Sequence, residues 1–132
     1  MTTHTTNTIE QAASPGMEKI RAERKRQIEV EGWTYEHDDK YANGELARAA
    51  SSYESAYHEA SIQPHKWPWD RAWWKPKDRV SNLVRAGALY LAESERLERK
   101  GENTRANHWR QWAEIIAVEI NTEMKSRPEK IK

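Results

Sequence analysis

The chain has 132 residues, which is enough for one compact domain and too few for two. Its 22 basic and 21 acidic side chains leave a net charge of +1, which argues against a broad electrostatic grip on duplex DNA or on an anionic membrane. The absence of cysteine excludes disulfides, thiolate nucleophiles and cysteine metal clusters. Because the sequence has neither a membrane-spanning apolar run nor an apolar signal core, we expect a cytoplasmic protein.

Residues 1–13 are polar and aperiodic, and we expect them to form a disordered tail. A Ser-Pro pair, typical of a helix start, then predicts a charged helix over residues 15–31, which the following glycine should end. We expect an irregular polar stretch over residues 33–43.

A second helix is predicted after Asn43, which is a good N-cap. Its core-facing side chains, at helical spacing, are Leu46, Ala49, Ala50, Tyr53, Tyr57 and Ala60. Residues 62–77 then combine three prolines with four tryptophans, a composition that neither a long helix nor a central strand tolerates. This segment predicts an ordered, tryptophan-rich loop.

A third helix is predicted over residues 78–100. Its middle, AGALYLA at residues 86–92, is apolar on every side, as in a helix enclosed by neighbours. Gly101 has the character of a C-terminal cap, and Asn103 or Thr104 that of the next N-cap. A tight turn should therefore send a fourth helix back antiparallel to the third.

No segment alternates apolar and polar residues as a half-buried strand does, so we expect no sheet. The elements together predict an all-α single domain over residues 14–127, with about four principal helices and the Trp/Pro-rich loop between the second and the third. A short basic tail should follow over residues 128–132. The apolar flanks of helices two and three predict self-association into a homo-oligomer.

Acidic residues and a histidine gather between the first two helices: Glu36, His37, Asp38, Asp39 and Glu45. Carboxylate oxygens are the ligands that Mg²⁺ prefers, and a bound Mg²⁺ would bridge to substrate phosphates. Asp38, Asp39 and Glu45 could converge on one such ion. The alternative is a solvated polar turn, in which Glu45 complements the positive end of its helix. Zinc has little support, because His37 has no second histidine at ligand spacing.

The segment PHKWPWDRAWWKPKD at residues 64–78 interleaves indole rings with cationic side chains. A site that stacks a base and neutralises phosphates needs this combination. Trp69 and Trp73 are candidates for stacking, and Arg71 and Lys75 are candidates for phosphate binding. The alternative is a hydrophobic lid, in which the rings close one end of the bundle and the charges stay in water.

A polar stripe lies opposite the apolar face of the third helix: Asn82, Arg85, Glu93 and Arg96. On a helix enclosed by neighbours these groups need partners or a ligand. Asn82 and Arg85 are therefore ligand-binding candidates, and Glu93 is a fourth candidate carboxylate for Mg²⁺. If this face is solvated, Glu93 instead pairs with Arg96 or Arg85.

Four segments together resemble a widespread and mostly uncharacterised family of phage and prophage proteins: ERKRQIEVEGWTYEHDD, GELARAASSY, WPWDRAWWKP and NLVRAGALYLAESERLER. The resemblance covers residues 23–99. It implies a phage protein that acts in the cytoplasm of a host cell, and it implies little about activity.

The order of features is also similar to that of the all-α nucleoside triphosphate pyrophosphohydrolases of the MazG and dCTPase type. The first helix ends near Trp33, GELARA opens the second, a tryptophan-containing connection follows, and AGALYLAESERL forms the third. The resemblance implies an oligomeric helical bundle that cleaves nucleotides to monophosphate and pyrophosphate, with Mg²⁺ held by an E-x-x-E and an E-x-x-D pair. Glu45 matches the second glutamate of the first pair, whereas Ala42, Leu83 and Ala86 occupy the other three positions.

A third likeness is to ryanodine-receptor repeat domains, through GWTYEHDDK and NLVRAGALYL. Those domains are small helical modules. The likeness implies a protein that binds a ligand or a partner and does not catalyse a reaction.

These patterns predict a MazG-like, nucleotide-binding phage protein, either a divergent Mg²⁺-dependent pyrophosphohydrolase or a protein that only sequesters its ligand. The ligand, a nucleotide or another phosphate-bearing small molecule, should lie between the acidic turn, the third helix and the loop. The rival function is a non-enzymatic accessory protein that binds a host protein through the loop. Mg²⁺ is assigned to Asp38, Asp39, Glu45 and Glu93, with Glu45 and Glu93 catalytic. Ligand binding is assigned to Trp33, His37, Trp69, Arg71, Trp73, Lys75, Asn82 and Arg85.

Overall fold

The computed structural model describes residues 14–126, and within this range it is helical and contains no strand, which confirms the all-α prediction. The predicted tails at residues 1–13 and 128–132 lie outside the described residues. The elements in chain order are α2 (Pro15–Glu29), α3 (Tyr35–Asp39), α4 (Glu45–Glu54), the 3-10 helix η1 (Arg71–Trp73), α5 (Arg79–Arg99) and α6 (Asn103–Ser126).

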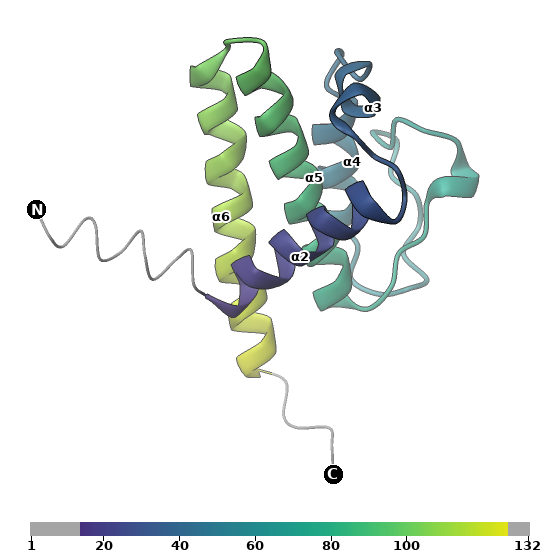
Figure 1. The fold of residues 1–132 in the computed structure, drawn as a ribbon. Helices are drawn as coiled ribbons and strands as arrows, with labels where there is room; N and C mark the ends of the chain where they lie inside the picture. The colour runs from purple at the N-terminus through teal and green to yellow at the C-terminus, as the bar shows by residue number, and fades with distance from the viewer. Residues whose placement is uncertain (1–13, 127–132) are drawn as a thin grey trace, which may run out of the picture.

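The central helix is α5, against which α2, α3, α4 and α6 all pack (Figure 1). Its AGALYLA segment is buried as predicted, with only Leu91 partly exposed. Burying one large apolar side chain is worth roughly 1.5–3 kcal/mol, so this segment contributes strongly to the core. Gly101, at a φ of 79°, follows the end of α5, and α6 then lies antiparallel beside it, as predicted.

Glycines let α2 approach both α5 and α6 closely. At the crossing with α5, a Cβ on Gly87 would overlap the side chain of Ile20. At the start of α2, a Cβ on Gly16 would overlap the backbone carbonyl of Ala117 in α6, and the Gly16 N–H donates to Asn121 Oδ1 at 2.7 Å. These two contacts fix how α2 lies across the α5/α6 pair (Figure 1).

The second predicted helix is shorter than its apolar pattern indicated. It ends at Glu54, and the expected buried positions from Tyr57 onward are exposed and lie in a loop. The cause lies in α5, where the Arg79 guanidinium donates to the carbonyls of Glu54 at 2.6 Å and Ala56 at 2.9 Å. Asn82 Nδ2 also donates to the Ala56 carbonyl, at 3.1 Å. These side chains satisfy carbonyls that a longer helix would use for its next turn.

The stretch predicted to be irregular, residues 33–43, contains the short helix α3. The Thr34 hydroxyl caps this helix by accepting from the His37 N–H at 3.3 Å. The cap predicted at Asn43 falls instead on Gly44, whose φ of 82° is in the left-handed region that glycine adopts readily.

None of the helices within residues 14–126 combines the length and the apolar character that a membrane crossing requires. Self-association stays a prediction. The apolar flanks of α4 and α5 are largely buried within the chain, whereas α6 exposes Ile115 and Val118.

Candidate functional site

A cavity of about 1220 Å³ lies between α2, α3, the tryptophan-rich loop and the first half of α5. Three kinds of side chain line it. The aromatic ones are Trp33, His37, Tyr41, Tyr53, Trp67, Trp69 and Trp73. The charged and polar ones are Lys19, Glu23, Arg26, Gln27, Glu31, Asp70, Lys75, Lys77, Ser81 and Arg85, and the aliphatic ones are Ala22, Val80, Val84 and Leu89.

The aromatic side chains form a continuous row from α3 into the loop. Trp33 stacks on His37 with ring centroids 5.6 Å apart and planes 7° apart, and His37 meets Tyr41 edge-on at 5.2 Å. Tyr41 lies 5.1 Å from Trp69, which meets Trp67 edge-on at 5.3 Å. Because such contacts restrict ring orientation, the row presents an ordered wall to the cavity.

Two loop indoles are also tied to the loop backbone. Trp67 Nε1 donates to Asp70 O at 3.1 Å, and Trp74 Nε1 donates to Ser61 O at 3.0 Å. Trp67 is 7% exposed, whereas Trp73 is 65% exposed although it borders the cavity. Some rings of the loop thus close the core, as the lid alternative predicted, and others border the cavity, where base stacking stays a prediction.

Cationic side chains border the cavity where the loop joins α5. Arg85 Nη1 donates to Tyr53 Oη at 3.2 Å and to Lys75 O at 3.3 Å, and the guanidinium lies 5.1 Å from the centroid of the Tyr53 ring. Within residues 14–126, no ion pair engages Arg85, Lys75 or Lys77. The charges of Lys75 and Lys77 therefore remain available to an anionic ligand, and that of Arg85 is shared with nearby Glu23.

On the α2 side, the cavity is bordered by a connected polar cluster. The Glu23 carboxylate oxygens accept from Arg26, each at 2.9 Å, and Glu23 Oε2 also accepts from Gln27 Nε2 at 3.1 Å. Burial alone would raise the pKa of Glu23. The hydrogen bonds and charge of Arg26, the charge of Arg85 and the bond from Gln27 outweigh burial and hold this pKa below its ordinary value. Glu23 is therefore ionised at neutral pH.

Most of the predicted ligand-binding residues come together at this cavity: Trp33, His37, Trp69, Trp73, Lys75 and Arg85. The exceptions are Arg71 and Asn82. Arg71 is exposed in η1 and does not border the cavity. Asn82 is buried, and its amide bonds only to backbone groups: Nδ2 donates to Ala56 O and Lys77 O, and Oδ1 accepts from the Lys77 N–H at 2.6 Å. Asn82 therefore has a structural role.

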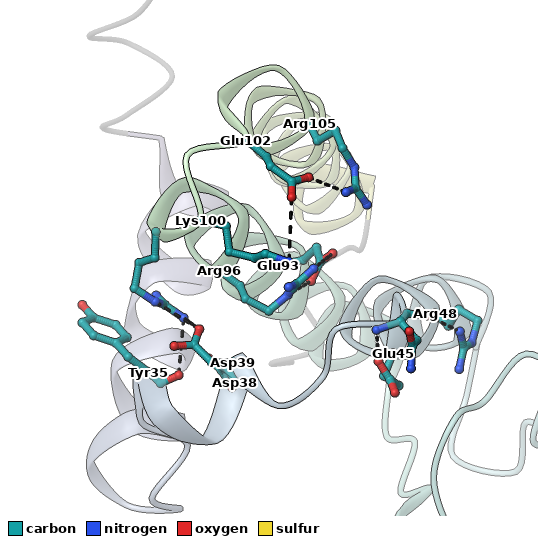
Figure 2. Close-up of polar contacts among 12 residues, drawn as sticks. Tyr35, Asp38, Asp39, Glu45, Arg48, Glu93, Arg96, Lys100, Glu102 and Arg105 are labelled. Carbon is teal, nitrogen blue, oxygen red and sulfur yellow. Dashed lines mark hydrogen bonds and ion pairs between the residues drawn. The ribbon is translucent and has the colours of Figure 1, made fainter.

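The predicted Mg²⁺ ligands, in contrast, do not border the cavity. Glu45 lies near Arg48 on α4, well apart from Asp38 and Asp39 on α3 (Figure 2). Within residues 14–126, no group of three or more histidine or acidic side chains is placed to hold a metal ion. The predicted Mg²⁺ site at these four carboxylates, with Glu45 and Glu93 catalytic, has no support in this geometry.

Arginines bind the two α3 carboxylates instead. Asp38 is 0% exposed and its Oδ2 accepts from Arg24 at 2.9 Å, while the same guanidinium donates to Glu95 at 2.8 Å. Asp39 lies on the surface and accepts from Arg99 at 2.6 Å (Figure 2). The two carboxylates thus hold the acidic turn to α2 and to α5, and neither of them borders the cavity.

The other two carboxylates also have local partners. Glu93 accepts from Arg96 at 2.9 and 3.0 Å, which is the pairing that one alternative predicted. The pair lies in the core, with Glu93 1% and Arg96 2% exposed, and not on a solvated face. Glu45 Oε1 accepts from the Asn43 N–H at 2.8 Å, so this carboxylate helps to start α4.

Sequence reasoning missed the residues of α2 that line the cavity. It also missed two tyrosines that line the cavity from other segments. Glu23, Arg26 and Gln27 recur three and four residues apart, which places them on one helix face, and this spacing was the available signal. Tyr41 and Tyr53 carried no such signal, because a tyrosine next to an apolar helix face is equally typical of a core residue.

Comparisons of the chain with family models, with curated proteins and with solved structures find no match in any of the three. The phage, MazG-like and ryanodine-receptor resemblances stay predictions. The geometry of the cavity is therefore the basis on which a function can be inferred.

Proposed function

We propose that this chain binds a nucleotide in the cavity between α2, the tryptophan-rich loop and α5. The observation that carries the proposal is the convergence on one cavity of an ordered aromatic row and of three cationic side chains, Lys75, Lys77 and Arg85, that form no ion pair within residues 14–126. A nucleotide combines a flat ring, which stacks on aromatic faces, with phosphates, which attract cations. The two kinds of cavity wall match these two parts of the ligand.

Each of these contacts would contribute to the affinity for a nucleotide. Stacking one base on an aromatic side chain is worth roughly 1–3 kcal/mol, and a hydrogen bond to a charged group is worth roughly 1.5–3 kcal/mol. The base would stack on a ring of the aromatic row, while Lys75, Lys77 and Arg85 would bind the phosphates. At about 1220 Å³ the cavity is larger than most small-molecule sites, which leaves room for several phosphates.

The cavity favours binding over hydrolysis. The acids in its wall are Glu23 and Glu31, which both pair with Arg26, and Asp70, whose Oδ1 caps η1 by accepting from the Ala72 N–H at 3.1 Å. The predicted catalytic residues Glu45 and Glu93 are not among its lining residues. We therefore favour a protein that sequesters a nucleotide. The phage-like segments of the sequence suggest the cytoplasm of an infected cell as its place of action.

The test is calorimetric titration of the purified chain with ATP, GTP, CTP and UTP. At least one should bind, and Arg85→Met should weaken that binding about tenfold or more, because it removes a charged phosphate contact. Arg71→Met is the matched control, since Arg71 is a nearby arginine of the tryptophan-rich loop that does not border the cavity. Asp39→Asn and Glu45→Gln should also leave the affinity unchanged. Failure of all four nucleotides to bind, or equal effects of the two arginine substitutions, would contradict the proposal.

Binding of a protein partner through the loop is a second candidate function. It is favoured by three large side chains that are exposed in and near the loop, Tyr57 at 63%, Ile62 at 87% and Trp73 at 65%. Ile62 does not border the cavity, so Ile62→Ser separates the two functions. If a bacterial protein co-purifies with the chain, this substitution should release it and leave nucleotide affinity intact. Retention of the partner would contradict docking at this surface.

A further inference from the structure

The cavity wall contains two side chains with a polar atom that no described residue satisfies. Gln27 Oε1 and Trp69 Nε1 are buried and have no hydrogen-bond partner within residues 14–126. Both residues border the cavity. One atom is an acceptor and the other is a donor.

We propose that these two side chains recognise the edge of the bound base, with Gln27 Oε1 accepting from a base N–H and Trp69 Nε1 donating to a neighbouring base oxygen or nitrogen. This inference rests on the proposed nucleotide binding and deepens it. The Watson–Crick edge of every nucleobase carries an N–H donor next to an acceptor, and proteins that bind unpaired bases use this edge.

The neighbours of Gln27 set the orientation of its amide. Its Nε2 donates to Glu23 Oε2 at 3.1 Å, and Glu23 is itself held by bonds from Arg26 at 2.9 Å each. Because an ionised carboxylate only accepts hydrogen bonds, the amide nitrogen must be the atom that faces Glu23. The oxygen is then the atom left without a donor. Gln27 is 0% exposed, so bulk water does not supply that donor.

Trp69 differs from the indoles beside it in the loop. The N–H of Trp67 donates to Asp70 O, and that of Trp74 donates to Ser61 O. The loop therefore provides a carbonyl acceptor for two of its indoles and none for Trp69. An acceptor from a ligand would complete the set.

Buried polar atoms in native proteins nearly always have partners, so two unsatisfied atoms in one cavity wall call for an explanation. A base that supplies the missing donor and acceptor gains affinity, and an analogue without the donor loses it. Both atoms are covered by surrounding protein atoms, so we expect a small rearrangement of the wall as the base enters.

The test measures whether the base N–H and Gln27 act on each other. The nucleotide that binds most tightly among ATP, GTP, CTP and UTP is compared with its methylated counterpart, which is N6,N6-dimethyl-ATP, N1-methyl-GTP, N4,N4-dimethyl-CTP or N3-methyl-UTP. In the wild type, methylation should weaken binding about tenfold or more. In Gln27→Met, which keeps the side-chain length but lacks the acceptor, methylation should change the affinity little.

Gln63→Met is the matched control for this substitution. Gln63 Oε1 is also buried and has no hydrogen-bond partner among the described residues, but Gln63 does not border the cavity, so its variant should behave as the wild type does. Two results would overturn the base-edge contact and leave the proposed nucleotide binding intact. In one, methylation of the base lowers the affinity equally in wild type and Gln27→Met, and in the other it lowers the affinity in neither of them. Failure of all four nucleotides to bind would overturn both proposals.

A second measurement needs no change at Gln27. In ¹⁵N-labelled wild-type protein, the indole N–H resonance of Trp69, assigned with Trp69→Phe, should move downfield when the nucleotide is added. The resonance of Trp74 should move little, because its N–H is already bonded to Ser61 O. A Trp69 resonance that does not move in saturating nucleotide would also overturn the inference.

Discussion

Arg24 joins three helices through one guanidinium group. It extends from α2 and donates to Asp38 in α3 at 2.9 Å and to Glu95 in α5 at 2.8 Å. Arg24 is 4% and Asp38 is 0% exposed, so neither charge has water as an alternative partner. Oδ1 of the Asp38 carboxylate lies 3.1 Å from Nδ1 of His37, and His37 borders the cavity. The acidic turn therefore positions one end of the aromatic row.

Arg24→Met should lower the free energy of unfolding by about 3–5 kcal/mol, because it leaves the Asp38 carboxylate buried without its cation. The measurement is urea denaturation at neutral pH. The matched control is Arg99→Met, which breaks the exposed pair with Asp39 and should cost less than about 1 kcal/mol. Equal losses in the two variants would show that burial does not distinguish these pairs.

The lowered pKa of Glu23 should make the free energy of unfolding depend on pH. Its pKa in the folded chain lies below the ordinary value of 4.5, so folding favours the charged form. The resulting stabilisation is present above the ordinary value and is lost as the pH falls through the folded-state pKa. The difference in unfolding free energy between wild type and Glu23→Gln should therefore shrink below that ordinary value of 4.5. Urea denaturation across the acid range measures it, and a constant difference would contradict the prediction. In an Arg26→Met background the pH dependence should largely disappear.

At the scale of elements, the crossing of α2 and α5 depends on the missing side chain of Gly87. Gly87→Ala places a methyl group against Ile20 and should destabilise the fold by about 1–3 kcal/mol, despite the better helix propensity of alanine. Chemical denaturation measures the loss. Ile20→Val removes the nearest methyl group, so the double variant should be more stable than the sum of the two single effects predicts. Strict additivity would mean that the two side chains do not meet.

The helices that the sequence predicted well are those whose signals are local. The start of α2, the apolar middle of α5 and the glycine turn before α6 all follow from residues within one or two helical turns. The early end of α4 does not, because it depends on Arg79, which lies more than twenty residues further along the chain. The same holds for α3, whose Asp38 is anchored by Arg24 from another helix.

For the molecule as a whole, the sequence allowed the aromatic and cationic side chains of the cavity to be predicted. It did not allow a prediction of which carboxylates lie near one another. Indoles and lysines crowded into one short loop must lie near each other, whatever the fold. Carboxylates on different elements, such as Glu45 and Glu93, come together only if the tertiary structure brings them together. Groups close by in the chain bind them instead, as Arg96 binds Glu93 and the Asn43 N–H binds Glu45.

If the cavity binds a nucleotide, the ligand should stabilise the entire domain, because all the walls belong to one folded unit. At a nucleotide concentration about 100 times the dissociation constant, the free energy of unfolding should rise by about 2.7 kcal/mol. Urea denaturation with and without nucleotide measures the rise, and Arg85→Met at the same concentration should show a smaller one. A nucleotide that binds without stabilising the fold would have to bind the unfolded chain equally well.

The close packing of the loop indoles has an optical consequence. Trp67 lies 5.3 Å from Trp69 with the ring planes 86° apart, and 5.0 Å from Trp74 with the planes 66° apart. Electronic transitions of indoles this close and this far from parallel couple as excitons and give circular-dichroism bands of opposite sign on top of the helical spectrum. Far-ultraviolet dichroism would therefore misstate the helix content of this chain, and the coupled bands would report, without a label, whether the loop keeps its shape.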